Sequence, residues 1–281
     1  MCSQKPDCDS KLSRFHIATI LTGVTATAVC FLVSGSMRWE VLLAIAVAYV
    51  LLFAIGVTFI RLQFFGPVVC RGPVGEKLCA LTFDDGPDPI ATTRLMELLR
   101  REHVQATFFC VGARVLESPD TAAQIVADGH LLGNHSHRHS WWTNLLSPGA
   151  LAEEILCAQS AIQTAAGMTP LYYRPPVGLT NPGTAIVMRR LKLICVGWSV
   201  RSLDRNSISV RRVVRRIQRG LREGGIVLLH DGGVDPHRLL TIVEQVITWA
   251  RKEGYRFVRL DQLLDNVGAS NASSRIATAE V

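Results

Sequence analysis

The segment LTFDDGPDP, residues 81–89, contains the pattern that decides the fold and two candidate site residues. It places two adjacent carboxylates, Asp84 and Asp85, between a short apolar run and a Gly-Pro turn. If the run is a buried strand, successive side chains point to opposite faces, and both acids lie where the strand ends. Two like charges there are costly to bury unless an opposite charge stabilises each of them. Each of the two acids therefore needs a cationic partner.

The chain has 281 residues, and from residue 77 onward short apolar runs alternate with longer helical patterns. Such alternation predicts a parallel sheet, either open or rolled into a barrel. The predicted strands are 78–83, 106–111, 130–133, 171–174, 194–200, 226–230 and 257–260. The predicted helices are 91–103, 120–128, 148–166, 182–191, 209–223 and 237–253.

Ionisable side chains follow most of these predicted strands. In parallel α/β folds the carboxyl ends of the strands form the reactive face. Two histidines and one carboxylate are a common ligand set for a catalytic zinc ion that keeps one position open. The residues expected at this face are Asp84, Asp85, His135, His137, His139, Arg174, Asp204, His230 and Asp231.

Two 20-residue runs near the N-terminus, 16–35 and 41–60, contain no Asp, Glu, Lys or Arg. A 20-residue helix covers about 30 Å, the thickness of the hydrocarbon core of a bilayer. The segment 36–40 between them has room only for a turn. We therefore predict a two-helix transmembrane hairpin, with a signal peptide or buried soluble helices as the alternatives.

Basic residues flank the predicted hairpin unevenly. Three lie before it, one lies in its turn and three follow it, if the count ends at Lys77. This count favours both ends of the hairpin, and hence the following domain, on the cytoplasmic side of the membrane. The five cysteines beyond residue 61 are odd in number and widely spaced, which is typical of core packing in a reducing compartment.

The net charge is +7, and much of it comes from arginines between residues 211 and 222. Apolar residues recur among them at helical spacing, so the segment is an amphipathic helix. Its basic face either contacts solvent or lies against anionic lipid, which attracts Lys and Arg by about 1 kcal/mol each. No aromatic residues are interleaved with the arginines, so nucleic acid is not expected as a partner. No protein partner is evident either.

Five motifs occur in a fixed order between residues 82 and 231. They resemble the motifs of the polysaccharide deacetylase family, which includes NodB-like chitooligosaccharide deacetylases and peptidoglycan N-acetylglucosamine deacetylases. The resemblance covers about residues 77–265 and implies a distorted (β/α) barrel of the NodB-homology type and a metal-dependent N-deacetylase. The motifs are TFDDGP (82–87), H-S-x-x-H (135–139), R-P-P-x-G (174–178), S-L-D (202–204) and L-L-H-D (228–231).

The resemblance also implies a role for each matching residue. Asp85, His135 and His139 correspond to the ligands of a divalent metal, most simply Zn²⁺, with Co²⁺ or another divalent ion as alternatives. Asp84 corresponds to the general base, and Arg174 pairs with it. His230 corresponds to the general acid, which Asp204 orients. Leu228 and Pro176 are expected to line the substrate pocket, and His137 has no assigned role.

The fourth motif departs from the family pattern. Where the family often has Asp-x-x-Asp-Trp, this chain has Arg201-Ser-Leu-Asp204-Arg205, so Arg205 stands where a Trp helps to form the substrate groove. Two arginines beside the groove would suit an anionic substrate. Both arginines pointing into solvent is the alternative interpretation.

Taken together, these patterns predict five regions. They are a tail over 1–15, the hairpin over 16–60, a linker over 61–76, a catalytic domain over 77–265 and a disordered tail over 266–281. We expect a two-span protein of a bacterial-type cell membrane.

The predicted activity is removal of an N-acetyl group from an amino sugar in a poly- or oligosaccharide containing N-acetylglucosamine. Two alternatives remain. One is a deacetylase or deformylase of a lipid-linked amino sugar at the membrane. The other is a non-catalytic glycan-binding membrane protein. The lipid of the bilayer is the further partner that the hairpin implies.

Overall fold

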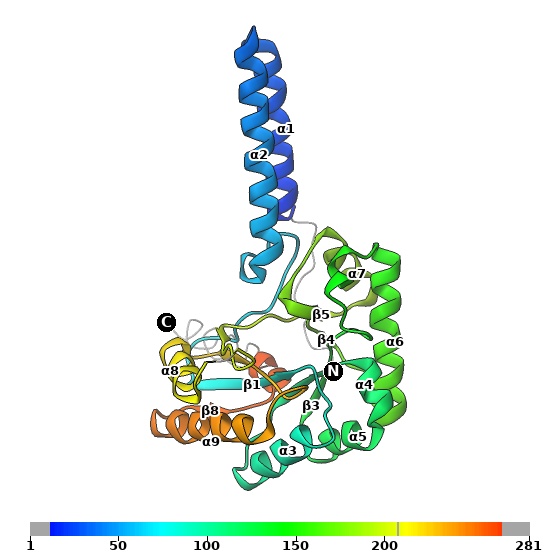
Figure 1. Ribbon diagram of the computed structural model, residues 1–281, viewed down its shortest axis with the longest axis vertical. Helices are drawn as coiled ribbons and strands as arrows, with labels where there is room; N and C mark the ends of the chain where they lie inside the picture. The colour runs from blue at the N-terminus through cyan, green and yellow to red at the C-terminus, as the bar shows by residue number, and fades with distance from the viewer. Residues whose placement is uncertain (1–11, 207, 266–281) are drawn as a thin grey trace, which may run out of the picture.

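The computed structural model describes residues 12–206 and 208–265, so the predicted disordered tail at 266–281 lies outside the described residues. A parallel sheet of eight strands forms the centre of the domain, and helices surround it (Figure 1). The strands are β1 (Leu78–Asp84), β2 (Thr107–Cys110), β3 (Leu131–Asn134), β4 (Tyr172–Tyr173), β5 (Ile194–Cys195), β6 (Val200–Arg201), β7 (Gly225–His230) and β8 (Arg256–Phe257).

The strand order is β5-β4-β3-β2-β1-β7-β6, with β8 paired to β1. All the strand pairs are parallel, so the carboxyl ends lie at one end of the sheet. The predicted distorted barrel is confirmed. Strand β1 is buried along its whole length, as its mainly apolar sequence predicts for a central parallel strand.

The prediction of one continuous strand over 194–200 is wrong. The segment is divided between β5 and β6, which are the two end strands of the sheet order. The chain therefore crosses the opening of the barrel at residues 196–199. Val69 forms a bridge with Val196, and the Ser199 amide donates to the Ile226 carbonyl at 3.0 Å. The crossing segment is therefore hydrogen-bonded to the segment around Val69 and to β7.

The helices cover the sheet with their apolar faces. α3 and α9 pack side by side, α8 packs against α9, and α6 packs against α4, α5 and α7. Two groups of buried side chains form the core, one on each face of the sheet strands. The helices of the domain are α3 (Ala91–Arg101), α4 (Gly112–Glu117), α5 (Pro119–Ala127), α6 (Pro148–Ala166), α7 (Pro182–Leu191), α8 (Val210–Gly220) and α9 (Pro236–Lys252).

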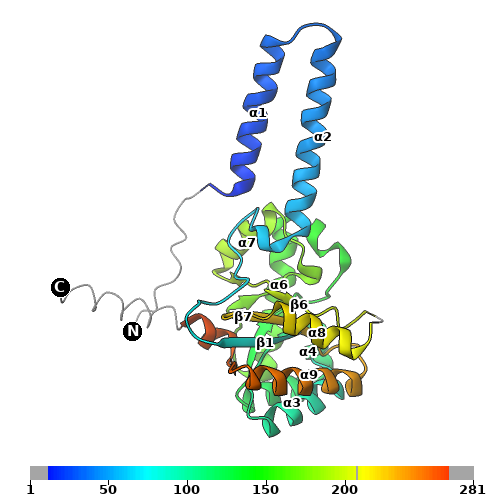
Figure 2. The ribbon, with the colours of Figure 1, turned by 90° about the vertical axis from the view of Figure 1, so that its left-hand side faces the viewer.

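Helices α1 (Arg14–Leu32) and α2 (Ser36–Thr58) form a hairpin that projects from the domain (Figures 1 and 2). Both are long and apolar enough to cross a membrane, and almost none of their residues are buried. The rings of Phe15, Phe53, Phe64 and Phe65 pack together at the hairpin base. The Thr180 amide also donates to the Val57 carbonyl at 3.3 Å, so the base of the hairpin contacts the domain.

Candidate active site

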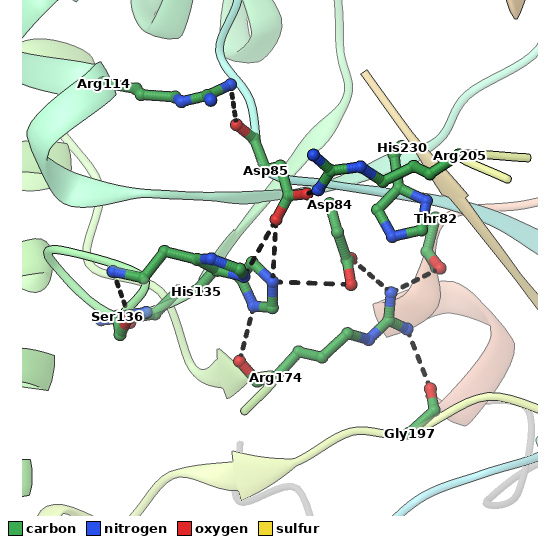
Figure 3. Close-up of polar contacts among 12 residues, drawn as sticks. Thr82, Asp84, Asp85, Arg114, His135, Ser136, Arg174, Gly197, Arg205 and His230 are labelled. Carbon is green, nitrogen blue, oxygen red and sulfur yellow. Dashed lines mark hydrogen bonds and ion pairs between the residues drawn. The ribbon is translucent and has the colours of Figure 1, made fainter. Parts of the chain in front are cut away.

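The sheet brings the predicted site residues together because its strands are parallel and in register. Asp84 at the end of β1 is the register partner of His230 at the end of β7. Asn134, which precedes His135, pairs with Tyr173, which precedes Arg174. Side chains from four strand ends therefore meet at one edge of the sheet (Figure 3).

Asp84 forms a buried ion pair with Arg174. The Arg174 Nη1 donates to Asp84 Oδ1 at 2.7 Å and to Thr82 Oγ1 at 2.8 Å, and Nη2 donates to the Gly197 carbonyl at 2.9 Å. The guanidinium also lies 4.0 Å from the centre of the Phe109 ring. Arg174 is 0% exposed, and these contacts fix the direction of its side chain. One of the two cations required by the adjacent acids is thus part of the protein.

Asp85, His135 and His139 form the second group. One ligand atom from each lies within 4.8 Å of the others, a separation that suits a shared metal ion. Asp85 Oδ1 lies 3.4 Å from His135 Nε2 and 3.1 Å from His139 Nε2. Asp85 and His139 both have positive φ, 73° and 50°, which is costly for residues with a Cβ. Such strain is typical of positions that the surrounding structure holds for function.

The protonation pattern of His135 fits a cation at this point. Its Nδ1 lies 2.7 Å from the Arg174 carbonyl, so Nδ1 is the donor and Nε2 carries the lone pair in the neutral ring. That lone pair points toward carboxylate oxygens of both Asp85 and Asp84, the latter at 3.7 Å. Burial disfavours a charged His135, but the two carboxylates outweigh burial and raise the pKa of this imidazole. The two carboxylates therefore favour positive charge at this position.

The other two members of the group have the charge states that ligands need. Burial opposes the charged form of Asp85, but its hydrogen bond with His135 and the nearby imidazoles lower the pKa of the carboxyl. Burial and the neighbouring His135 lower the pKa of His139 to about 4, so this imidazole is neutral at pH 7. An ionised carboxylate and neutral imidazoles are the forms that bind a divalent metal.

His230 and Asp204 form the third group. His230 Nδ1 donates to Asp204 Oδ1 at 2.9 Å, and the His230 amide donates to Oδ2 at 2.9 Å. Ser202 Oγ donates to Asp204 Oδ1 at 2.6 Å. Burial lowers the pKa of His230, but the hydrogen bond and the charge of Asp204 outweigh it, so the pKa is raised. The ring is held with Nε2 available to donate a proton.

The two arginines of the altered fourth motif have different surroundings. Arg205 forms an ion pair with Asp85 through Oδ2, and its side chain is 45% exposed. Arg201 instead lies over the Trp198 ring, 5.7 Å from its centre, and contacts a separate cavity. Arg205 therefore reaches the ligand group, whereas Arg201 is exposed and lies at the separate cavity. A place for Arg205 in the substrate pocket stays a prediction.

The remaining predicted residues lie close to the same edge of the sheet. Leu228 is buried on β7, two residues before His230 and therefore on the same face of the strand. Pro176 is buried in the short 3₁₀ helix that follows Arg174. His137 is not a member of the ligand group of Asp85, His135 and His139, and its Nδ1 lies beside Gly112, which begins α4.

Sequence reasoning missed the residues that support the loop of Asp85. Arg114 Nη1 donates to the Asp85 carbonyl at 2.7 Å, which fixes the peptide next to the positive φ. A Cβ on Gly232 would lie 2.0 Å from that carbonyl, so only glycine fits there. The one available signal was the Gly-Gly pair at 232–233, directly after the His-Asp motif.

The comparisons with known proteins agree with this geometry. The family described as "Polysaccharide deacetylase" matches residues 71–196. A peptidoglycan-N-acetylglucosamine deacetylase of Bacillus cereus is 34% identical over 201 residues, which cover 71% of this chain and 93% of that protein. The chain belongs to the polysaccharide deacetylase family. It is a deacetylase of the hydrolase class.

Two further relatives extend the likeness. A chitooligosaccharide deacetylase of a Bradyrhizobium species is 35% identical over 159 residues, 56% of this chain and 72% of that protein. The structure of an acetyl xylan esterase from Clostridium thermocellum, in complex with a cobalt ion, has a TM-score of 0.61 and 35% identity. It covers 66% of this chain and 89% of that one. The family match begins at residue 71, after the hairpin at residues 14–58.

Proposed function

We propose that this polysaccharide deacetylase is a metal-dependent enzyme that removes the N-acetyl group from an amino sugar of a poly- or oligosaccharide. One observation carries the proposal. A paired carboxylate, a ligand group for a divalent cation and a carboxylate-bound histidine converge at one edge of the sheet. An amide is a poor electrophile with a poor leaving group, and its hydrolysis needs all three kinds of group.

We propose Asp85, His135 and His139 as the residues that hold the cation, with Zn²⁺ as the ion that this donor set suits best. Bound there, it would polarise the acetyl carbonyl and increase the acidity of water. A relative of the family is known in complex with cobalt, which is consistent with a site for a divalent transition metal.

The chain's own residues supply the proton transfers. Asp84 is proposed as the general base, because the buried Arg174 holds its Oδ1 in place while Oδ2 remains for a proton. His230 is the proposed general acid, because Asp204 favours the charged ring. A positioned acid or base contributes roughly 10²- to 10⁴-fold to the rate. Leu228 and Pro176 are proposed to border the acetyl group.

We further propose that α1 and α2 span a membrane. Apolar side chains project from them without cover, among them Phe31 and Leu32, which are 84% and 83% exposed. An apolar surface of this kind on a protein marks a membrane or a partner. The proposed catalytic domain comprises residues 77–265, and 61–76 connects it to the hairpin. A reporter fused to the C-terminus tests the side of the membrane, for which the charge count favours the cytoplasm.

Metal analysis combined with turnover of N-acetylglucosamine oligomers tests the proposal. The purified full chain should bind about one divalent ion and release acetate, and a chelator should abolish the release. Asp84→Asn and His230→Ala should each lose most of the activity and keep the metal, because neither is a proposed ligand. Full activity in both variants, or binding of glycan without any metal, would overturn the assignment.

A further inference from the structure

A cavity of about 900 Å³ lies between the end of the hairpin and α8, away from the metal ligands. Its wall includes Thr58 and Phe59 at the end of α2, and Trp198 in the crossing between β5 and β6. Six arginines line it, and we name it the arginine pocket. They are Arg61, Arg201, Arg212, Arg215, Arg216 and Arg219.

No carboxylate lines this pocket, and none of the six arginines forms an ion pair with an acid among residues 12–206 and 208–265. Six like charges around one cavity repel each other. A ligand that carries negative charge relieves this repulsion. The lining therefore specifies an anion.

Several of the arginines are held in place by contacts that leave donors for a ligand. Arg61 Nε donates to the Trp198 carbonyl at 3.0 Å, and Arg216 Nε donates to the Arg201 carbonyl at 2.7 Å. A guanidinium that is anchored through Nε retains its two terminal NH₂ groups. Arg201 stacks over Trp198 at 5.7 Å from the ring centre. Prearranged guanidinium groups match the oxygens of a phosphate, which they bind in bidentate fashion.

The position of the pocket indicates the source of that phosphate. Residues 58–61 lie where the apolar helix α2 ends, and α8 lies below that end (Figure 2). In a hairpin that spans a bilayer, the end of the helix lies at the level of the lipid headgroups. Phosphates of lipids are therefore concentrated at the mouth of the pocket.

We propose that the arginine pocket binds the phosphate or diphosphate headgroup of a membrane lipid. The inference rests on the proposed membrane anchoring and not on the deacetylase chemistry. The pocket shares a loop with the active site, because Arg201 and Leu203 line the pocket while Ser202 bonds Asp204. A lipid phosphate bound there lies beside the loop whose Ser202 bonds Asp204.

Native mass spectrometry of the full chain in detergent with added phosphatidylglycerol tests the proposal. The variant Arg212→Gln/Arg215→Gln removes two charges from the pocket. The control Arg190→Gln/Arg211→Gln removes two exposed charges outside it, one of them on the same helix α8. At about 1 kcal/mol per arginine, the pocket variant should bind the lipid about 30-fold more weakly. The control should stay within about twofold of the unchanged protein.

Two further measurements distinguish a lipid headgroup from free phosphate as the bound anion. Phosphatidylcholine, which has no net charge, should bind more weakly than phosphatidylglycerol, and millimolar inorganic phosphate should not displace the bound lipid. Equal losses in the pocket and control variants would mean unspecific charge attraction and would overturn the proposal. Displacement by inorganic phosphate would also overturn it, in favour of a site for free anions. Near-ultraviolet circular dichroism shows that each variant is folded, so loss of binding is not loss of structure.

Discussion

Arginines occupy two opposite environments in this molecule. Arg174 is 0% exposed, and its guanidinium donates to Thr82, to the Gly197 carbonyl and to the carboxylate of Asp84. The arginines of the pocket beside α2 are exposed and have no carboxylate partner within the described ranges. In the active site, the charge of Arg174 is thus paired within the protein before any substrate arrives. The arginine pocket leaves its charges for a ligand from outside.

The largest effect expected from this comparison is on stability. Arg174→Met leaves Asp84 buried without a partner, so the free energy of unfolding should fall by about 3–5 kcal/mol. Denaturant or thermal unfolding in detergent, without added metal, measures it. Adding Asp84→Asn to this variant should recover part of the loss, because the unpaired charge is then removed. Arg201→Met is the matched change in the pocket, and an equal loss there would contradict the distinction.

Asp204→Asn tests whether the pairing of Asp204 with His230 also controls the proton transfer proposed for His230. Asp204 raises the pKa of His230, so its loss should lower that pKa and leave the ring neutral at a lower pH. The alkaline limb of the kcat/KM profile should therefore move to lower pH, and the maximal rate should fall on the order of 10²-fold. Ser202→Ala, which removes only a donor to Asp204, should move the limb less. A rate loss without any shift of the limb would point to a merely structural role for Asp204.

Arg205 lies between the two environments, because it is half-exposed yet pairs with the proposed ligand Asp85. A guanidinium beside a divalent cation repels it, so Arg205→Gln should tighten Zn²⁺ binding on the order of tenfold. Competition with a chromogenic chelator measures the affinity. Arg201→Gln removes the same charge from the pocket and should leave Zn²⁺ affinity unchanged. Weaker binding in Arg205→Gln would mean that Arg205 serves mainly to orient Asp85.

Much of the fold follows from sequence pattern, because parallel strands with alternating helices place their carboxyl ends at one edge. Asp84, Arg174 and His230 meet there for that reason. The prediction of one strand over 194–200 was wrong because the apolar residues of this run are typical of a single continuous strand. Only the closure of the barrel shows that the chain crosses an opening, at a point where Arg174 bonds the Gly197 carbonyl.

The groups that long charged side chains contact could not be predicted from the sequence pattern in the same way. Arg201 and Arg205 are four residues apart, yet Arg201 lines the arginine pocket while Arg205 pairs with Asp85. This difference depends on the path of the backbone through residues 202–204. Arg114 was missed for a related reason, since its partner is a backbone carbonyl of a distant loop. The arginine-rich helix was predicted, but the apolar helix end that completes its pocket lies about 150 residues earlier in the sequence.

The smallest effect is expected where charge is unpaired and solvated. Arg219→Gln removes one of six mutually repelling charges and breaks no ion pair among the described residues, so stability should change by no more than about 0.5 kcal/mol. At low ionic strength the variant should be slightly more stable than the unchanged protein. This gain should disappear at high ionic strength, because salt screens the repulsion. Thermal unfolding of the lipid-free chain at low and high salt measures both. A large loss of stability at low salt would mean that Arg219 is held by the protein, as Arg174 is, and the contrast between the two regions would not extend to this residue.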